Sequence, residues 1–123
     1  MKILVADDYP ATLDIYKRVL QRAGHEIVTA RNGEKAWEAF RVAVQELTPF
    51  GLLMLDVSMP ITNGLECAIK IRRFEKEQDM TPTRLIFLSA HLGQIPIADV
   101  ARLGIHTVAQ KPIGLDELQA LVE

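Results

Sequence analysis

The sequence predicts a doubly wound α/β domain, with a five-stranded parallel sheet and five helices. Short β-favouring segments alternate with longer segments of helical periodicity, as expected when crossover helices connect parallel strands. Three of the short segments are continuously apolar, which is typical of strands covered by helices on both faces. A length of 123 residues, with 49% hydrophobic and 24% charged residues, suits one packed domain.

Five strands are expected, and the three apolar ones should form the centre of the sheet. Their apolar runs are Ile3–Val5, Leu52–Leu55 and Leu85–Leu88. The five expected ranges are Lys2–Asp7, Glu26–Ala30, Leu52–Asp56, Arg84–Leu88 and Ile105–Ala109.

The segments between the strands carry helix signals. In Pro10–Ala23, apolar residues recur at helical spacing, proline suits the first turn, and Gly24 suits the C-terminal stop. The remaining helices are expected between Gly33 and Pro49, from Gly64 to about Lys76, from Pro96 to Gly104, and from Leu115 through Val122. The second helix is expected to bury Ala36, Phe40, Val44 and Leu47.

Charge and hydropathy exclude several classes of protein. The 14 basic and 16 acidic residues give a net charge of -2, without the basic excess of a nucleic-acid binder. The longest apolar runs are four residues, too short for a membrane span or a signal-peptide core. Cys67, the single cysteine, cannot form an internal disulfide. We therefore expect a cytoplasmic protein that contacts neither nucleic acid nor membrane directly.

Acidic residues gather at the carboxyl ends of the expected strands. Asp7 and Asp8 end the first strand and Asp56 ends the third. Ligands of doubly wound folds bind at this edge, and in a sheet of order 2-1-3-4-5 the first and third strands are neighbours about 4.8 Å apart. Three carboxylates cannot all stay ionised there unless a divalent cation neutralises them; otherwise repulsion raises a pKa. Oxygen-only ligands favour Mg²⁺, which predicts a magnesium site.

Two further strand ends carry polar groups. Lys111 follows the fifth strand, about 10 Å from Asp56 at the backbone, and its long stem can bring the ammonium to Asp56 or to an anion there. Ser89 follows the fourth strand and offers a hydroxyl that can rotate toward a new acceptor. One nucleophile, one metal, one cation and one adjustable donor suit in-line phosphoryl transfer.

Four motifs, in chain order, resemble the receiver domain of two-component response regulators, including its chemotaxis members. They are Ile3–Asp8, Asp56–Gly64, Leu88–Ala90 and Lys111–Pro112. The resemblance covers essentially the whole chain. It implies a flavodoxin-like sheet of order 2-1-3-4-5 and a receiver domain over residues 1–123. The last helix has only about nine residues, below the usual mean, which suggests that the chain is cut within it.

The resemblance also implies roles for the site residues. Asp56 would accept a phosphoryl group from the phosphohistidine of a histidine kinase or phosphotransfer protein. Asp8 would bind Mg²⁺ directly, Asp7 through a water, and the Ser58 carbonyl would complete the metal shell together with Asp56. Ser89 and Lys111 would hold the other phosphoryl oxygens. The domain would then be a signalling switch that catalyses only its own phosphorylation and dephosphorylation.

Other expectations come from the same resemblance. Lys111–Pro112 should be a cis peptide, and His91 should tune the lifetime of the phosphoryl group. The family usually has an aromatic residue at the position of Val108, so the usual relay to the face of the last helices is in doubt. From its place on the expected second helix, Trp37 should lie away from Asp56, where its emission would report poorly on the site. Phosphodonors should dock on the first helix and its surroundings, through Ala11, Thr12, Ile15 and Pro112.

Three alternatives remain open at this point. A Mg²⁺-dependent phosphohydrolase would use Asp56 as a transient nucleophile, but the Asp-x-Asp pairing of such enzymes is missing after the first strand. An interaction module would keep the site inert. Flavin binding is disfavoured, because Tyr9-Pro10 stands where a phosphate-binding loop would be needed. The kinase, the stimulus, the output domain and the oligomeric state are not encoded in these patterns.

Overall fold

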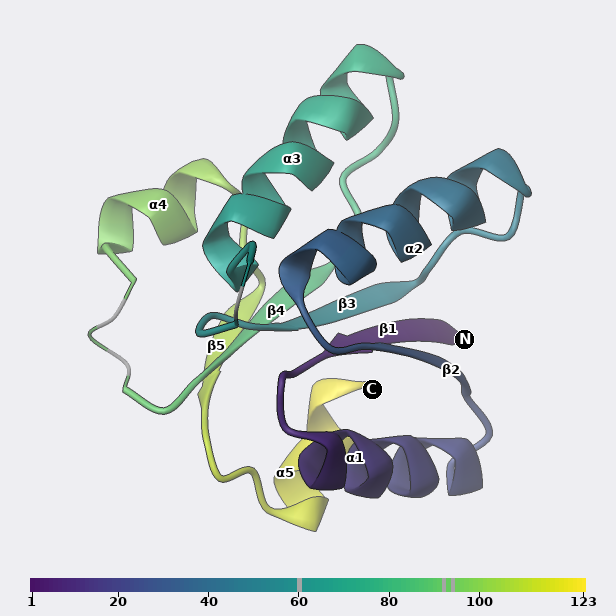
Figure 1. Cartoon of the computed structure of the whole chain (residues 1–123), viewed down its shortest axis with the longest axis vertical. Helices are drawn as coiled ribbons and strands as arrows, with labels where there is room; N and C mark the ends of the chain where they lie inside the picture. Colours follow the sequence, from purple (N-terminus) through teal and green to yellow (C-terminus); the bar gives the residue numbers. More distant parts are fainter. Residues whose placement is uncertain (60, 92, 94) are drawn as a thin grey trace.

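The computed structural model describes residues 1–59, 61–91, 93 and 95–123, and contains the predicted five-stranded parallel sheet (Figure 1). The strands pair in the order β2-β1-β3-β4-β5, which confirms the fold class and the strand order. The strands are β1 (Lys2–Ala6), β2 (Glu26–Ala30), β3 (Leu52–Asp56), β4 (Leu85–Ser89) and β5 (Thr107–Gln110).

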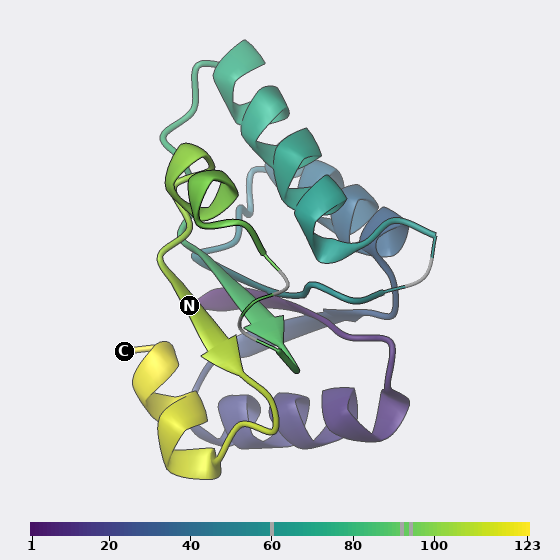
Figure 2. The ribbon, with the colours of Figure 1, turned by 90° about the vertical axis from the view of Figure 1, so that its left-hand side faces the viewer.

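Helices cover both faces of the sheet. One face carries α1 and α5, and the other carries α2, α3 and α4 (Figures 1 and 2). The helices are α1 (Pro10–Arg22), α2 (Gly33–Gln45), α3 (Gly64–Glu77), α4 (Ile97–Arg102) and α5 (Leu115–Leu121). Within the described residues, none of these helices combines the length and the apolar character that crossing a bilayer requires.

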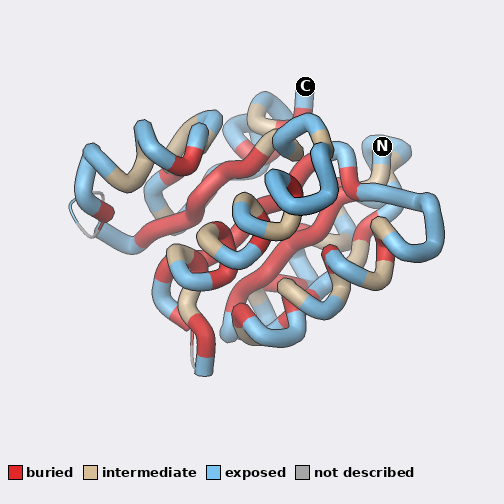
Figure 3. The backbone as a smooth tube through the Cα atoms, turned by 90° about the horizontal axis from the view of Figure 1, so that it is seen from above, coloured by how far each residue is buried: buried red, intermediate tan, exposed pale blue. Residues whose placement is uncertain are grey.

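The core lies on both sides of the three central strands. Side chains alternate along β1: Leu4 faces α2 and α3, whereas Ile3 and Val5 pack with residues of α1 and α5. Every residue of β3 and β4 is buried, as their apolar sequences predict (Figure 3). The rigid centre of the sheet therefore fixes the strand ends at which the polar residues lie.

Local signals begin and end the helices. The Asn32 side chain caps α2 by accepting from the Lys35 N–H at 2.7 Å. Asn63 and Glu66 form a reciprocal capping box at the start of α3. Gly24 follows α1 with a φ of +94°, a left-handed conformation that costs glycine little. These polar and glycine residues therefore fix the turns at the ends of the helices.

The prediction that Leu47 is a buried residue of the second helix is wrong. The helix ends at Gln45, and Leu47 is 87% exposed with a φ of +62°. The N–H groups of Leu47 and Thr48 donate to the carbonyls of Val44 and Ala43, the pattern of a Schellman cap. Ala43 takes the buried position, and Val44 is only partly buried. Because a leucine occupies the position usually held by glycine, the sequence does not mark this helix end.

Several predicted boundaries shift by one or two residues. Ser89 is the last residue of β4 rather than the residue after it, and β5 begins at Thr107. Pro96 occupies the N-cap position of α4, so that helix begins at Ile97. Shifts of this size are usual, because the ends of helices fray and are defined only to within one or two residues.

Candidate functional site

Three carboxylates meet at the carboxyl edge of the sheet. Asp7, Asp8 and Asp56 each offer an oxygen, and these oxygens lie within 4.8 Å of one another. Ala6 and Leu55 are partners in the β1–β3 register, so the residues that follow them, Asp7 and Asp56, lie side by side. Asp7 and Asp56 are buried, whereas Asp8 is exposed. The structure thus brings together the three acids that the sequence pattern singles out.

Lys111 joins two of these acids. Its Nζ donates to Asp7 Oδ2 at 2.8 Å and to Asp56 Oδ2 at 3.0 Å. The sequence pattern indicated a pair with Asp56 but not with Asp7. The Lys111 backbone N–H donates to the Ser89 carbonyl at 2.7 Å, which ties the residue to the end of β4. The Lys111–Pro112 peptide is cis, as predicted.

Each buried acid is also held by the backbone. The Tyr9 N–H donates to Asp7 Oδ1 at 3.0 Å, and the Ser58 N–H donates to Asp56 Oδ1 at 3.1 Å. Both are Asx turns, in which a carboxylate accepts from the amide two residues further on. One oxygen of each acid therefore accepts from the local turn and the other from Lys111, which fixes both carboxylates.

The loop after Asp56 returns close to the end of β3, where its last residues approach the Asp56 backbone. A Cβ added to Gly64 would lie 2.3 Å from the Asp56 carbonyl oxygen, so only glycine fits this close approach. The Gly64 N–H donates to the Val57 carbonyl at 3.0 Å. Ser58, the predicted backbone ligand, is exposed just after β3. Pro60, part of the same sequence motif, lies outside the described residues.

Ser89 is buried at the end of β4 and turned toward the following loop. Its Oγ donates to the His91 carbonyl at 2.6 Å and accepts from the His91 N–H at 3.1 Å. The hydroxyl is thus engaged with the loop in this structure. Because a hydroxyl can rotate and exchange partners, the same group can reach another arrangement when a stronger acceptor appears.

Burial and charge act together on the ionisation of the site. Burial is the largest influence on Asp56 and raises its pKa, with a smaller rise from Asp7, while hydrogen bonds from Lys111 and Ser58 lower it; the net shift is upward. Burial lowers the pKa of Lys111, but its bonds to Asp7 and Asp56 outweigh this, and its pKa is raised. The ammonium is therefore held in its charged form between two acids.

The donor set fits a hard dication. Two buried carboxylates bind a single ammonium and a third, exposed carboxylate lies beside them, which leaves an excess of negative charge in a small volume. All three are oxygen ligands on neighbouring strand ends. Mg²⁺ is usually held by one or two carboxylates with several waters, and the exposed side at Asp8 leaves access to solvent. The residues present thus match the needs of Mg²⁺.

The predicted docking residues lie around the start of α1. Ala11 and Pro112 are exposed, Thr12 is half-buried, and Ile15 is 52% exposed, as its position off the buried arc predicts. The buried face of α1 is instead formed by Leu13, Tyr16 and Leu20. An apolar side chain is therefore presented to solvent on the helix that begins beside the acidic cluster.

Three further residues that the sequence analysis singled out lie outside the acidic cluster. Trp37 packs on α2 against Phe40 and Phe74, with ring centroids 6.4 and 5.5 Å away. Val108 is half-buried on β5 and carries no ring. His91 is exposed beside Ser89, where the tuning role predicted for it stays a prediction.

Comparison with known proteins finds similar chains. The family model described as response regulator receiver domain matches residues 3–123. The transcriptional regulatory protein CrdR of Helicobacter pylori is 33% identical over 120 residues, which are 98% of this chain and 52% of that relative. The chain thus spans about half of the length of CrdR.

Two solved structures share the fold. The response regulator protein TrrA from Thermotoga maritima, in complex with Mg²⁺ and BeF, is 33% identical, with a TM-score of 0.79 and coverage of 98% of this chain and 95% of that one. The co-crystal structure of the Saccharomyces cerevisiae phosphotransfer protein Ypd1 with the receiver domain of Ssk1 gives a TM-score of 0.84 at 22% identity. That match covers 99% of this chain and 86% of the other. At such identity the likeness is one of fold.

Proposed function

The chain belongs to the response regulator receiver domain family, and we propose that Asp56 is the residue that its phosphodonor phosphorylates. The domain is a phosphorylation-dependent signalling switch. The observation that carries the assignment is the position of Asp56: it is a buried carboxylate within 4.8 Å of two other acids and 3.0 Å from Lys111. In this proposal residues 1–123 form one receiver domain.

The chain's own residues supply the parts of the transfer reaction. An Asp56 carboxylate oxygen attacks phosphorus, the new O–P bond forms as the P–N bond of a phosphohistidine breaks, and the imidazole leaves with the electron pair and takes up a proton. The Ser58 N–H orients the attacking carboxylate. Lys111 then moves its bond from Asp56 Oδ2 to a phosphoryl oxygen, so the ammonium stays paired throughout.

We propose that Asp7, Asp8, Asp56 and the Ser58 carbonyl hold Mg²⁺. The excess negative charge of the three acids supports this assignment. When bound, Mg²⁺ would neutralise charge on the carboxylates and on the phosphoryl oxygens that approach them. Without that neutralisation, two carboxylates would repel an incoming phosphoryl dianion despite the presence of Lys111.

Ser89 couples the new charge to the loop after β4. Its hydroxyl would leave the His91 carbonyl and donate to a phosphoryl oxygen, which releases the loop bond of 2.6 Å. The loop then has two arrangements, in which the Ser89 hydroxyl donates either to the His91 carbonyl or to a phosphoryl oxygen. Phosphorylation favours the second arrangement. Because Val108 has no ring to move inward, this loop is the direct route for the signal out of the site.

We propose that the donor is a histidine kinase or histidine phosphotransfer protein. It would dock on Ala11, Thr12, Ile15 and Pro112, around the start of α1. The complex of Ypd1 with the Ssk1 receiver domain supports a phosphotransfer partner for this fold. The proposal places the chain in the cytoplasm, with catalysis limited to its own phosphorylation and dephosphorylation.

Intact-mass analysis tests the assignment. The protein is incubated with acetyl phosphate and Mg²⁺, and we expect one phosphoryl adduct that is absent in Asp56→Asn and without Mg²⁺. Asp14→Asn, which removes an exposed carboxylate of α1, is the matched control and should form the adduct. An adduct that persists in Asp56→Asn would overturn the assignment. Steady release of inorganic phosphate from a general phosphoester would instead support a phosphohydrolase.

A further inference from the structure

A cavity of about 640 Å³ opens directly beside the acidic cluster. It is lined by Asp8, Thr29, Ala30, Arg31, Asn32 and Lys35. Asp8 belongs to the three-carboxylate cluster, so one wall of the cavity is part of the proposed metal site. The other walls come from the end of β2 and the first turn of α2. The cavity therefore adjoins the metal site on the side of the edge strand.

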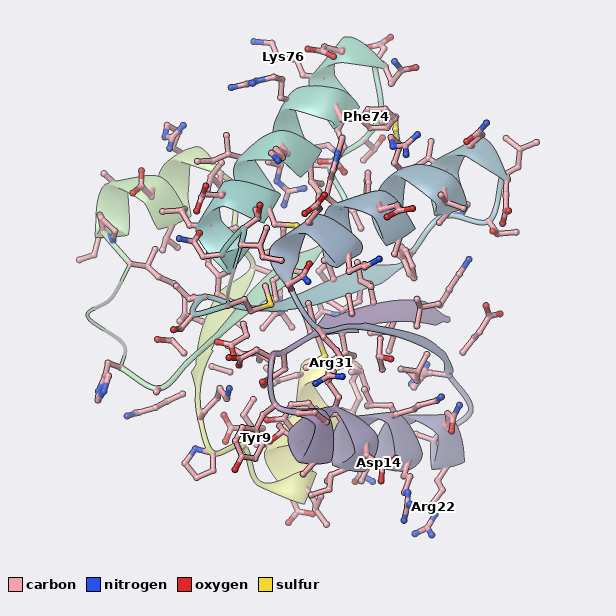
Figure 4. All side chains as sticks on the ribbon, in the orientation of Figure 1. Tyr9, Asp14, Arg22, Arg31, Phe74 and Lys76 are labelled. Carbon is pink, nitrogen blue, oxygen red and sulfur yellow. The ribbon has the colours of Figure 1, made fainter. Side chains whose placement is uncertain are left out.

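Two cations line this cavity. Arg31 follows β2, and Lys35 lies in the first turn of α2, and both side chains are exposed. In the described part of the chain, neither forms an ion pair or a side-chain hydrogen bond, whereas Arg18 and Arg102 each pair with an aspartate of their own helix. Figure 4 shows Arg31 between the end of β2 and α1, while Arg22 lies at the far end of α1. The two cations are thus available to an anion in the cavity.

The charge balance of the neighbouring site explains what these cations would recognise. Asp7, Asp8 and Asp56 carry three negative charges against one positive charge on Lys111, so one dication brings the cluster to neutrality. A phosphoryl dianion approaching this neutral cluster gains little long-range attraction from it. Arg31 and Lys35 add two positive charges on one side of the approach, and such fields raise the encounter rate of anions.

We propose that Arg31 and Lys35 form a recognition site for the phosphodonor's dianionic phosphoryl group before transfer. The inference rests on the proposed function, because it names how the donor reaches Asp56. The group enters the cavity against Arg31 and Lys35, then passes Asp8 to the Asp56 carboxylate. The O–P bond to Asp56 forms as the donor's bond to phosphorus breaks, and the leaving group departs with the electron pair. Arg31 and Lys35 are specificity-determining residues that do not touch the attacking oxygen.

Phosphorylation kinetics test this site with two donors. Acetyl phosphate is a small acyl phosphate, and monophosphoimidazole carries the leaving group of a phosphohistidine. Time courses by intact mass, at saturating Mg²⁺ and several donor concentrations, give the second-order rate constant. We expect the Arg31→Ala/Lys35→Ala double variant to lower it about tenfold at low ionic strength, the low end of electrostatic steering. Added salt should slow the wild type more than the double variant.

Arg22→Ala is the matched control, because it removes an exposed arginine of α1 remote from the cavity. It should keep the wild-type rate constant with both donors. The Mg²⁺ affinity of the double variant, measured by calorimetry, should be no weaker than that of the wild type, because cations near the metal are removed. A loss confined to acetyl phosphate assigns the cavity to small acyl phosphates, and a loss confined to monophosphoimidazole assigns it to phosphohistidine donors.

Two results would overturn the inference. One is a double variant whose rate constants equal those of Arg22→Ala with both donors while the wild type is phosphorylated, which leaves the proposed function intact. The other is a slower double variant whose Mg²⁺ affinity has fallen and whose rate constant returns to the wild-type value when the Mg²⁺ concentration is raised, which would place the effect at the metal. A wild type that forms no adduct with either donor would instead overturn the proposed function, and this inference with it.

Discussion

Gly33 and Thr62 meet through their backbones, and this contact joins the first residue of α2 to the loop between β3 and α3. The Gly33 N–H donates to the Thr62 carbonyl at 2.8 Å, and a Cβ on Gly33 would lie 2.0 Å from the same oxygen. Thr62 is buried, and Ile61 before it has a φ of +68°. The loop that begins with Val57 is therefore held by a backbone hydrogen bond from a neighbouring helix.

Gly33→Ala should destabilise the fold because the new methyl group meets backbone rather than a movable side chain. Overpacking of this kind costs about 1–3 kcal/mol. We expect a loss of that size in the free energy of unfolding, measured in urea. Gly114→Ser is the control, because nothing lies within 4 Å of a Cβ there and serine is favoured at a helix N-cap. Equal stabilities for the two variants would show that the Gly33 contact is easily relaxed.

Lys111→Ala should leave two buried carboxylates without their shared cation. Removing one partner of a fully buried pair costs about 3–5 kcal/mol. Since the Lys111 side chain is 22% exposed, we expect a smaller loss of about 1–3 kcal/mol without Mg²⁺. The same substitution in an Asp7→Asn background should cost less, because one acid is already neutral. If Lys111→Ala lowers the free energy of unfolding as much in the Asp7→Asn background as in the wild type, Lys111 stabilises the fold by packing alone.

Mg²⁺ should stabilise the protein through the acidic cluster. A ligand present at about 100 times its Kd adds about 2.7 kcal/mol to the free energy of unfolding. We expect an effect of that order in the wild type and its removal by EDTA, measured by thermal or urea unfolding. Asp8→Asn should lose most of it, whereas Asp14→Asn should keep it. Equal stabilisation of the Asp8→Asn protein would argue against the proposed metal ligands.

Much of the site is predictable because parallel strands end at one edge. Asp7 and Asp8 follow β1, Asp56 ends β3, and Lys111 follows β5, so the sheet places them together. The pairing of Lys111 with Asp7 is not encoded in any local pattern. It depends on how the lysine stem crosses two strand ends in the folded sheet.

The features that sequence reasoning missed are tertiary ones. Leu47 follows the helical spacing of α2, yet the chain turns there through a left-handed residue that is usually glycine. The cavity beside Asp8 lies between the segment after β1 and the β2–α2 junction, which meet only in space, so Arg31 and Lys35 look like ordinary surface cations in the sequence. Periodicity reports which face of an element is buried, but not which loops become neighbours.

Cys67 gives a prediction on pH. Burial raises the pKa of its thiol to about 12, so the folded state keeps the proton at a pH where the unfolded thiol has lost it. Unfolding therefore releases a proton, and stability should fall between about pH 9 and pH 12, by about 1.4 kcal/mol for each pH unit. Cys67→Ala should flatten this slope in urea unfolding. Parallel slopes in the two proteins would assign the loss to other groups.

Ile15→Asp should separate donor docking from the chemistry of the site. Ile15 is 52% exposed on α1, so the substitution should change the free energy of unfolding little, and acetyl phosphate should still label Asp56 at the wild-type rate. Phosphotransfer from the cognate histidine kinase should slow about tenfold, which corresponds to the loss of about 1.4 kcal/mol at one interface residue. Leu47→Asp, at another exposed apolar position, is the control and should transfer normally. Normal transfer to Ile15→Asp would exclude this face of α1 from the docking surface.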